Sequence, residues 1–311
     1  MKVSFPSRCL LVILPWMMIC HESRGVIVAG TSGTGNNNDT QAGLNSHLSD
    51  VAAAPFTNWQ NLVRVGNASG VYLGYNPNTS RGWVLSADHV AAPTSITVNG
   101  NLYSVQSGTR IGTSDLKLYE IGGGGSDPAL PGLSSVALAS NVASTGESVL
   151  MFGRGFTNST TAPYTWETPG SDESNGMRWG TNTITQLATV DDNPYIITDF
   201  SNLADLSVTA YEAQGATGDS GGGLFIFRFG QWQLAGIAHF VDDGPDLLEP
   251  FGSPTGDDVV NPSEFGDFTG YSDVQAYLNT IQGITGTLVP EPSSLWFAIS
   301  GIGLLLRRRR S

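Results

Sequence analysis

Gly218-Asp219-Ser220-Gly221-Gly222, a loop of glycines around one serine, runs directly into the β-type segments Leu224–Phe229 and Gln233–Ala238. Short apolar runs bounded by glycine favour strands over helices. The same pattern recurs earlier in the chain, at 71–75, 83–86, 96–98, 102–105, 116–121, 149–152, 183–190 and 195–200. Many short strands at this spacing predict an all-β fold, either a barrel or a sandwich.

We predict a single domain over residues 26–285, in which a polar arm precedes two halves. The chain has 39 glycines and only 13% charged residues, which suits tight turns. Glycines and prolines gather at 122–131, which we expect to divide the domain into two halves. Residues 30–48 are rich in Gly, Thr, Ser and Asn, and an exposed loop or flexible arm is expected there.

One short helix is predicted near the end of the domain. Val274, Tyr277, Leu278 and Ile281 share a face at helical spacing, and Ser272 or Asp273 can cap the helix N-terminus. Beyond Gly283 the chain becomes polar, so the domain should end near there.

Ser220 is the candidate nucleophile. Attack on an amide carbonyl needs an activated nucleophile, a base and hydrogen-bond donors for the developing oxyanion. The flanking glycines let the backbone turn sharply, so the N–H groups of Gly218 and Ser220 can converge on one point. The alternative is a glycine-rich surface turn with an incidental serine. A base and a carboxylate elsewhere in the chain would favour the nucleophile over the incidental serine.

The histidines after residue 25 are His47, His89 and His239. His47 lies in the polar arm and is expected to be solvated, whereas His239 follows an apolar strand and is expected to pack in a barrel. His89 ends the hydrophobic run 82–89, where a rigid strand can orient it as a base. A carboxylate should fix its tautomer. Asp115, the first residue of an alternating strand, is the candidate for this role. The alternative is that Asp115 is only a solvated carboxylate at the end of a strand.

The order of these three residues, each in its own signature, is similar to that of the chymotrypsin–trypsin family. The family motifs Ala-x-His, Asp-[Ile/Leu]-x-Leu and Gly-Asp-Ser-Gly-Gly have counterparts at 87–89, 115–118 and 218–222. Residues 271–281 resemble the family's closing helix. The resemblance implies a double six-stranded antiparallel β-barrel with the active site between the barrels. In it, Ser220 attacks a polypeptide substrate, His89 transfers the proton and Asp115 orients His89. The N–H groups of Gly218 and Ser220 hold the oxyanion.

The resemblance also carries implications for maturation. Asp219 occupies the position of the family's aspartate that pairs with a newly released N-terminal amine. Residues 24–30, RGVIVAG, resemble the family's activation site. Cleavage before Val26, or after one further residue, would therefore generate the activating terminus.

Three residues are assigned to the primary substrate pocket by the same resemblance. Gln214, six residues before the nucleophile, lies where an acidic residue would favour Arg or Lys substrates. Phe240 and Val241 match the pocket walls. Small or medium uncharged side chains are therefore expected before the scissile bond.

Two positions depart from the family pattern. Asp88 stands where alanine is usual, and it adds a carboxylate next to His89. His239 replaces the serine that usually contacts the catalytic aspartate. We expect these changes to shift the pH optimum or to orient Asp115 differently.

Both ends of the chain resemble export signals. Residues 1–25 combine Lys2 and Arg8 with an apolar run at 9–20 and predict a signal peptide cut by signal peptidase. Residues 286–311 hold Pro-Glu-Pro, an apolar run and four arginines. This order resembles the PEP-CTERM sorting signal of Gram-negative bacteria, which an exosortase recognises. An ordinary transmembrane tail anchor is the alternative. The sorting signal implies transient membrane association through the C-terminal segment, and either reading of this segment places the protein in the cell envelope or outside the cell.

Charge and cysteine content narrow the functions and kinds of site that the chain can have. Between residues 26 and 289, 7 basic and 25 acidic residues give a net charge of −18, which argues against nucleic-acid binding. Both cysteines lie in the predicted signal peptide, so no disulfide is expected. The acidic segment 242–258 could bind calcium, but a solvated loop is preferred. We predict an exported serine endopeptidase without cofactor or metal; a catalytically silent surface protein that binds polypeptides is the alternative.

Overall fold

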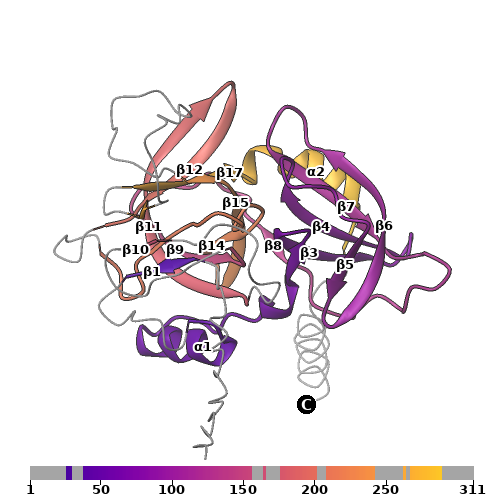
Figure 1. Ribbon diagram of the computed structural model, residues 1–311, viewed down its shortest axis with the longest axis horizontal. Coiled ribbons are helices and arrows are strands. Elements are labelled where there is room, and N and C mark those ends of the chain that lie inside the picture. The colour runs from indigo at the N-terminus through magenta and orange to yellow at the C-terminus, as the bar shows by residue number, and fades with distance from the viewer. Residues whose placement is uncertain are drawn as a thin grey trace, which may run out of the picture.

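The computed structural model describes residues 26–29, 38–155, 164–165, 176–201, 208–241, 262–263 and 267–288. Two β-barrels lie side by side in this part of the chain (Figure 1). The predicted signal peptide, the acidic segment 242–258 and residues 289–311 of the predicted sorting signal lie outside it. Within the described ranges, no helix has the length and apolar character needed to cross a membrane.

The first barrel is closed by six antiparallel strands in the order β2-β3-β4-β7-β6-β5. In β7, Leu116 and Leu118 are buried on either side of the partly exposed Lys117, as the two-residue period of a strand predicts. Tyr119 and Ile121 are buried as well, so both faces of the second half of this strand are covered. The strands are β2 (Leu62–Val65), β3 (Ala68–Asn76), β4 (Arg81–Ala87), β5 (Ser95–Val98), β6 (Asn101–Arg110) and β7 (Leu116–Ile121).

The second barrel also has six antiparallel strands, in the order β14-β9-β11-β12-β17-β15, and the pairing of β14 with β15 closes it. Its strands are β9 (Ser148–Gly153), β11 (Arg178–Val190), β12 (Asn193–Asp199), β14 (Gly223–Arg228), β15 (Gln231–Val241) and β17 (Phe268–Asp273). The short strand β8 (Ala137–Leu138) adds to β15 in parallel. The predicted all-β double antiparallel barrel is thereby confirmed.

Two small strand pairs accompany the barrels. β1 (Ile27–Val28) pairs with β13 (Ala213–Gln214), and β10 (Tyr164–Thr165) pairs with β16 (Pro262–Ser263). Ile27 is fully buried, so the segment that follows the predicted cleavage point is part of the folded domain.

The chain returns from the second barrel to the first through the predicted C-terminal helix. It passes from β17 into the 3₁₀ turn η2 (Gln275–Tyr277) and then into α2 (Leu278–Thr285). Asp273 Oδ1 accepts the N–H of Gln275 at 2.8 Å, so Asp273 caps a 3₁₀ turn rather than the α-helix itself. Val274 and Ile281 are fully buried in the main apolar cluster, which includes the core of the first barrel and neighbouring residues of the second. Asn76 of β3 donates to the carbonyl of Thr285 at 2.9 Å, so the helix ties both barrels together.

The expectation of an exposed loop or arm at 30–48 was wrong for part of this segment. Helix α1 (Gln41–Asp50) begins there, with Oγ1 of Thr40 accepting the N–H of Gly43 at 3.1 Å. Leu44 and Leu48 are buried against the barrels. These two leucines are the only buried residues of the helix. Two apolar positions in a polar segment are too few to reveal a helical period in the sequence. The turn η1 (Asn58–Asn61) then leads into β2.

Candidate active site

Neighbouring strand ends bring His89 and Asp115 together. β4 and β7 pair in antiparallel register, with Ala87 opposite Leu116, so the chain leaves β4 where it enters β7. The N–H of Asp88 donates to the carbonyl of Asp115 at 2.9 Å, which fixes the turn after β4. The N–H of His89 donates to Asp115 Oδ1 at 3.0 Å, and His89 Nδ1 lies 2.7 Å from Asp115 Oδ2. Asp115 is buried, and His89 is exposed.

Ser220 reaches the same point from the second barrel. Its Oγ lies 2.8 Å from His89 Nε2. The carbonyl of Ser220 accepts the N–H of Ser69 in β3 at 2.8 Å, so the loop before β14 is held against the first barrel. Asp115, His89 and Ser220 therefore form one continuous chain of side-chain contacts across the two barrels.

Glycines shape the loop that carries Ser220. Gly218 and Gly221 have φ angles of 91° and 84°, which side chains rarely tolerate. A Cβ at Gly221 would lie 2.0 Å from the carbonyl oxygen of Ser69. Within the described part of the chain, the backbone N–H groups of Gly218 and Ser220 have no acceptor. Both are thus available to a ligand oxygen.

Asp219 is buried beside the N-terminal segment. Its Oδ2 accepts the backbone N–H of Val26 at 3.0 Å and that of Ala216 at 2.7 Å, while Oδ1 accepts the N–H of Gly155 at 2.6 Å. Burial raises the pKa of Asp219 to about 6, although these bonds and the charge of Arg178 oppose the shift. The structure therefore places Asp219 against the residue that the sequence predicts as the mature N-terminus.

The residues assigned to the substrate pocket converge on one side of the second barrel. Gln214 is fully buried in β13, and a Cβ at the following Gly215 would lie 2.9 Å from Cγ1 of Val241. The N–H of Gly215 donates to Oγ1 of Thr269 at 2.9 Å. The ring of Phe240 lies so close to Gly270 that a Cβ there would be 2.2 Å from it. Thr269 and Gly270 thus belong to this region too.

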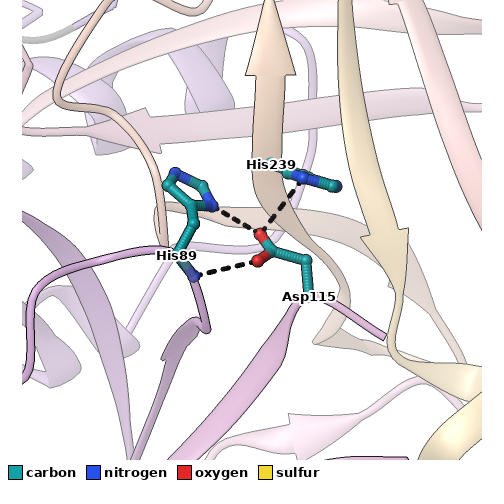
Figure 2. Close-up of side chains that lie close together, drawn as sticks. All are labelled: His89, Asp115 and His239. Carbon is teal, nitrogen blue, oxygen red and sulfur yellow. Dashed lines mark hydrogen bonds and ion pairs between the residues drawn. The ribbon is translucent and has the colours of Figure 1, made fainter. Parts of the chain in front are cut away.

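Asp88 and His239, the two residues that depart from the motifs the sequence resembles, have different surroundings. Asp88 pairs with Lys117 at 3.0 Å and Arg110 at 3.3 Å, so cations of β6 and β7 hold its carboxylate. His239 stands next to His89, with its ring stacked on that of His89 at 5.4 Å between centroids. His239 Nε2 lies 3.5 Å from Asp115 Oδ2 (Figure 2).

His47 was expected to be solvated, and the structure shows that it is not. His47 of α1 is partly buried and stacks on Trp179 at 5.6 Å between centroids, with Tyr211 edge-on at 4.9 Å. Burial lowers its pKa, and the charge of Asp50 opposes that shift. His47 therefore packs α1 onto the second barrel.

Sequence reasoning missed Tyr195 and Arg178 as neighbours of the site. The hydroxyl of Tyr195 lies 3.0 Å from His239 Nδ1. Arg178 is buried near Asp219 and donates to Asn38 Oδ1 at 2.8 Å. No local motif marks either residue, because strand pairing in the second barrel brings them to the site from distant segments.

Comparisons with known proteins find likeness only among solved structures. No protein-family model matches the sequence, and no curated protein matches it. The chain is similar to neuropsin, a serine protease expressed in the limbic system of mouse brain, with 15% identity and a TM-score of 0.48 over 74% of this chain and 96% of that one. It is also similar to kallikrein-related peptidase 10 in complex with Zn²⁺, with 16% identity and a TM-score of 0.46 over 74% and 98%.

Proposed function

We propose that this chain is an exported serine endopeptidase that hydrolyses polypeptides through an acyl-enzyme. One observation carries the proposal: Asp115, His89 and Ser220 are linked by contacts of 2.7 and 2.8 Å in the order that proton transfer requires. A packed histidine or a solvated carboxylate would not need all three groups in line. The position of the site between two rigid barrels supports the same reading, because strand ends hold its members in place.

The mechanism follows from this geometry. Asp115 fixes the tautomer of His89 with the proton on Nδ1, so that Nε2 accepts the proton of Ser220 as its Oγ attacks the scissile carbonyl. The N–H groups of Gly218 and Ser220 donate to the oxyanion. His89 then returns the proton to the leaving amine and later activates the water that releases the acyl group.

Maturation is proposed to occur by cleavage before Val26. In the intact chain Val26 has a φ of 52°, which is strained for a β-branched residue. Cleavage removes the preceding carbonyl and with it this strained torsion. The new ammonium group would then lie beside Asp219 Oδ2, where the backbone nitrogen of Val26 already sits at 3.0 Å. Signal peptidase would make this cut, and an exosortase would process the C-terminal signal at the cell envelope of a Gram-negative bacterium.

The proposed substrates have a small or medium uncharged side chain before the scissile bond. Gln214 supplies no negative charge there, Val241 fills the space beside the neighbouring Gly215, and the ring of Phe240 covers Gly270. A peptide library cleaved mainly after Arg or Lys would contradict this preference.

Labelling of the exported protein with a fluorophosphonate probe tests the function. The probe reacts with a serine only when a base activates it. We expect labelling of the wild type and none of Ser220→Ala, with Ser144→Ala as the matched serine control that keeps labelling. If the wild type with its Val26 terminus stays unlabelled, the chain is instead a catalytically silent protein that binds polypeptides.

A further inference from the structure

His239 gives the site a second histidine on the same carboxylate. His89 follows β4, Asp115 precedes β7 and His239 lies on β15, so three elements from both barrels meet here. Figure 2 shows a ring nitrogen of each histidine directed at the same oxygen of Asp115, at 2.7 Å from His89 Nδ1 and 3.5 Å from His239 Nε2. One ligand atom from each residue lies within 4.8 Å of the others.

Each of these side chains is held by a partner on the atom that points away from the cluster. His239 Nδ1 contacts the hydroxyl of Tyr195 at 3.0 Å, and His89 Nε2 contacts Ser220 Oγ at 2.8 Å. Asp115 Oδ1 accepts the N–H of His89 at 3.0 Å. Metal-binding histidines and carboxylates usually have such outer partners, which fix the tautomer and the ring direction. Here the partners leave His89 Nδ1, Asp115 Oδ2 and His239 Nε2 to share one ligand.

We propose that His89, Asp115 and His239 form a binding site for Zn²⁺ that reversibly inhibits the enzyme. Two imidazoles and one carboxylate are a donor set typical of zinc with one open position, whereas calcium and magnesium prefer oxygen ligands. Ligands about 2.1 Å from a tetrahedral zinc lie about 3.4 Å apart. The 3.5 Å separation already fits this spacing, and the 2.7 Å contact reaches it when His89, which is exposed, moves slightly outward.

The inhibitory consequence rests on the proposed peptidase function, whereas the binding does not. With zinc on Nδ1, the single proton of a neutral His89 must reside on Nε2. Nε2 then donates to Ser220 Oγ and cannot accept its proton. Zinc also binds the carboxylate of Asp115 and neutralises its negative charge, which otherwise stabilises the protonated imidazole of His89. Metal binding therefore blocks activation of Ser220 without any covalent change, and a chelator reverses it.

Binding is tested first on the exported wild-type protein, in which Ser220 keeps its contact with His89 Nε2. Co²⁺, which reports its geometry through visible absorption, is titrated in and then displaced by Zn²⁺. We expect one tetrahedral site, at least 10-fold weaker binding when His239→Gln is added, and about 10-fold weaker binding with Tyr195→Phe. His47→Gln, which alters the histidine on α1, is the control and should keep the affinity. No saturable site, or equal binding by the His239→Gln protein, would overturn the proposal.

Inhibition is tested second, by the rate of fluorophosphonate labelling in wild-type exported protein. We expect zinc to slow labelling at the concentration that fills the cobalt-defined site, and EDTA to restore it. Binding without slower labelling would overturn the inhibitory role. An absence of labelling in metal-free protein would instead count against the peptidase function, and the cobalt titration would still decide the metal site.

Discussion

At Gly221 the backbone of the second barrel passes against the first barrel with no room for a side chain. A Cβ there would lie 2.0 Å from the carbonyl oxygen of Ser69 and 2.3 Å from Oγ of Ser86. These two atoms are themselves joined by a hydrogen bond of 2.7 Å, so neither can move aside without losing it. The residue next to Ser220 is therefore glycine for a steric reason as well as for its φ of 84°.

Gly221→Ala should consequently lower the free energy of unfolding by about 3 kcal/mol or more, because a left-handed φ and a steric clash act together. Fluorophosphonate labelling of Ser220 should disappear with it. Gly230→Ala is the matched control, since Gly230 has a φ of 79° but nothing within 4 Å of its Cβ position. It should cost about 1 kcal/mol and keep labelling. Urea unfolding measures the free energy of unfolding of both variants. Equal losses in Gly221→Ala and Gly230→Ala would show that the steric clash plays no part.

At the residue scale, the sequence could identify groups with chemistry but not their neighbours. Ser220, His89 and Asp115 stand in local motifs, and the structure puts them within hydrogen-bonding distance of one another. The contact of His239 with Tyr195 depends on where β12 and β15 lie in the barrel. No local pattern reports such a contact, because it joins residues 44 positions apart.

At the scale of elements, most strands were predictable, whereas α1 was not, and residues 271–273, expected in the closing helix, belong instead to strand β17. Apolar runs between glycines marked the strands well, since most core strands of both barrels are buried along their length. Helix α1 has only Leu44 and Leu48 to bury, and its polar remainder resembles a loop. Tertiary packing, rather than propensity, holds this helix in place.

Leu44→Ala tests that account of α1. Leu44 is fully buried in the main apolar cluster, so its truncation should lower the free energy of unfolding by about 2–5 kcal/mol. Leu102→Ala, on β6 with 61% of the residue exposed, should change it by no more than about 0.5 kcal/mol. Chemical denaturation of both variants measures the difference. Comparable values would mean that α1 contributes nothing to the stability of the domain.

At the scale of the whole molecule, each barrel supplies part of the site and neither supplies all of it. His89 and Asp115 come from the first barrel, and Ser220 comes from the second. α2 and the bond between Ser69 and Ser220 hold the barrels together. The N-terminal segment is anchored to the loop that carries Ser220, because β1 pairs with β13 and Val26 contacts Asp219.

The contact of Val26 with Asp219 predicts opposite pH dependence before and after cleavage at Val26. In an uncleaved form that keeps a short extension, burial raises the pKa of Asp219 to about 6, while Arg178 opposes the shift and the neighbouring Tyr271 hydroxyl is neutral there. The folded state then holds its proton to higher pH than the unfolded chain, whose carboxyl has a pKa of about 4. Stability from this group is therefore present below pH 4 and falls by about 3 kcal/mol as pH rises to about 6.

In the cleaved form the sign reverses. The ammonium group of Val26 favours the carboxylate of Asp219 and lowers its pKa, so the folded state now loses its proton first. Stability from the pair is present above the unfolded pKa and falls as pH drops through the lowered folded pKa. Urea unfolding between pH 3 and 7, on Ser220→Ala protein whose N-terminus is verified by mass spectrometry, measures both slopes. Asp219→Asn should remove the difference between the two forms; if the slopes differ as much without the carboxylate, the N-terminal pairing is not their cause.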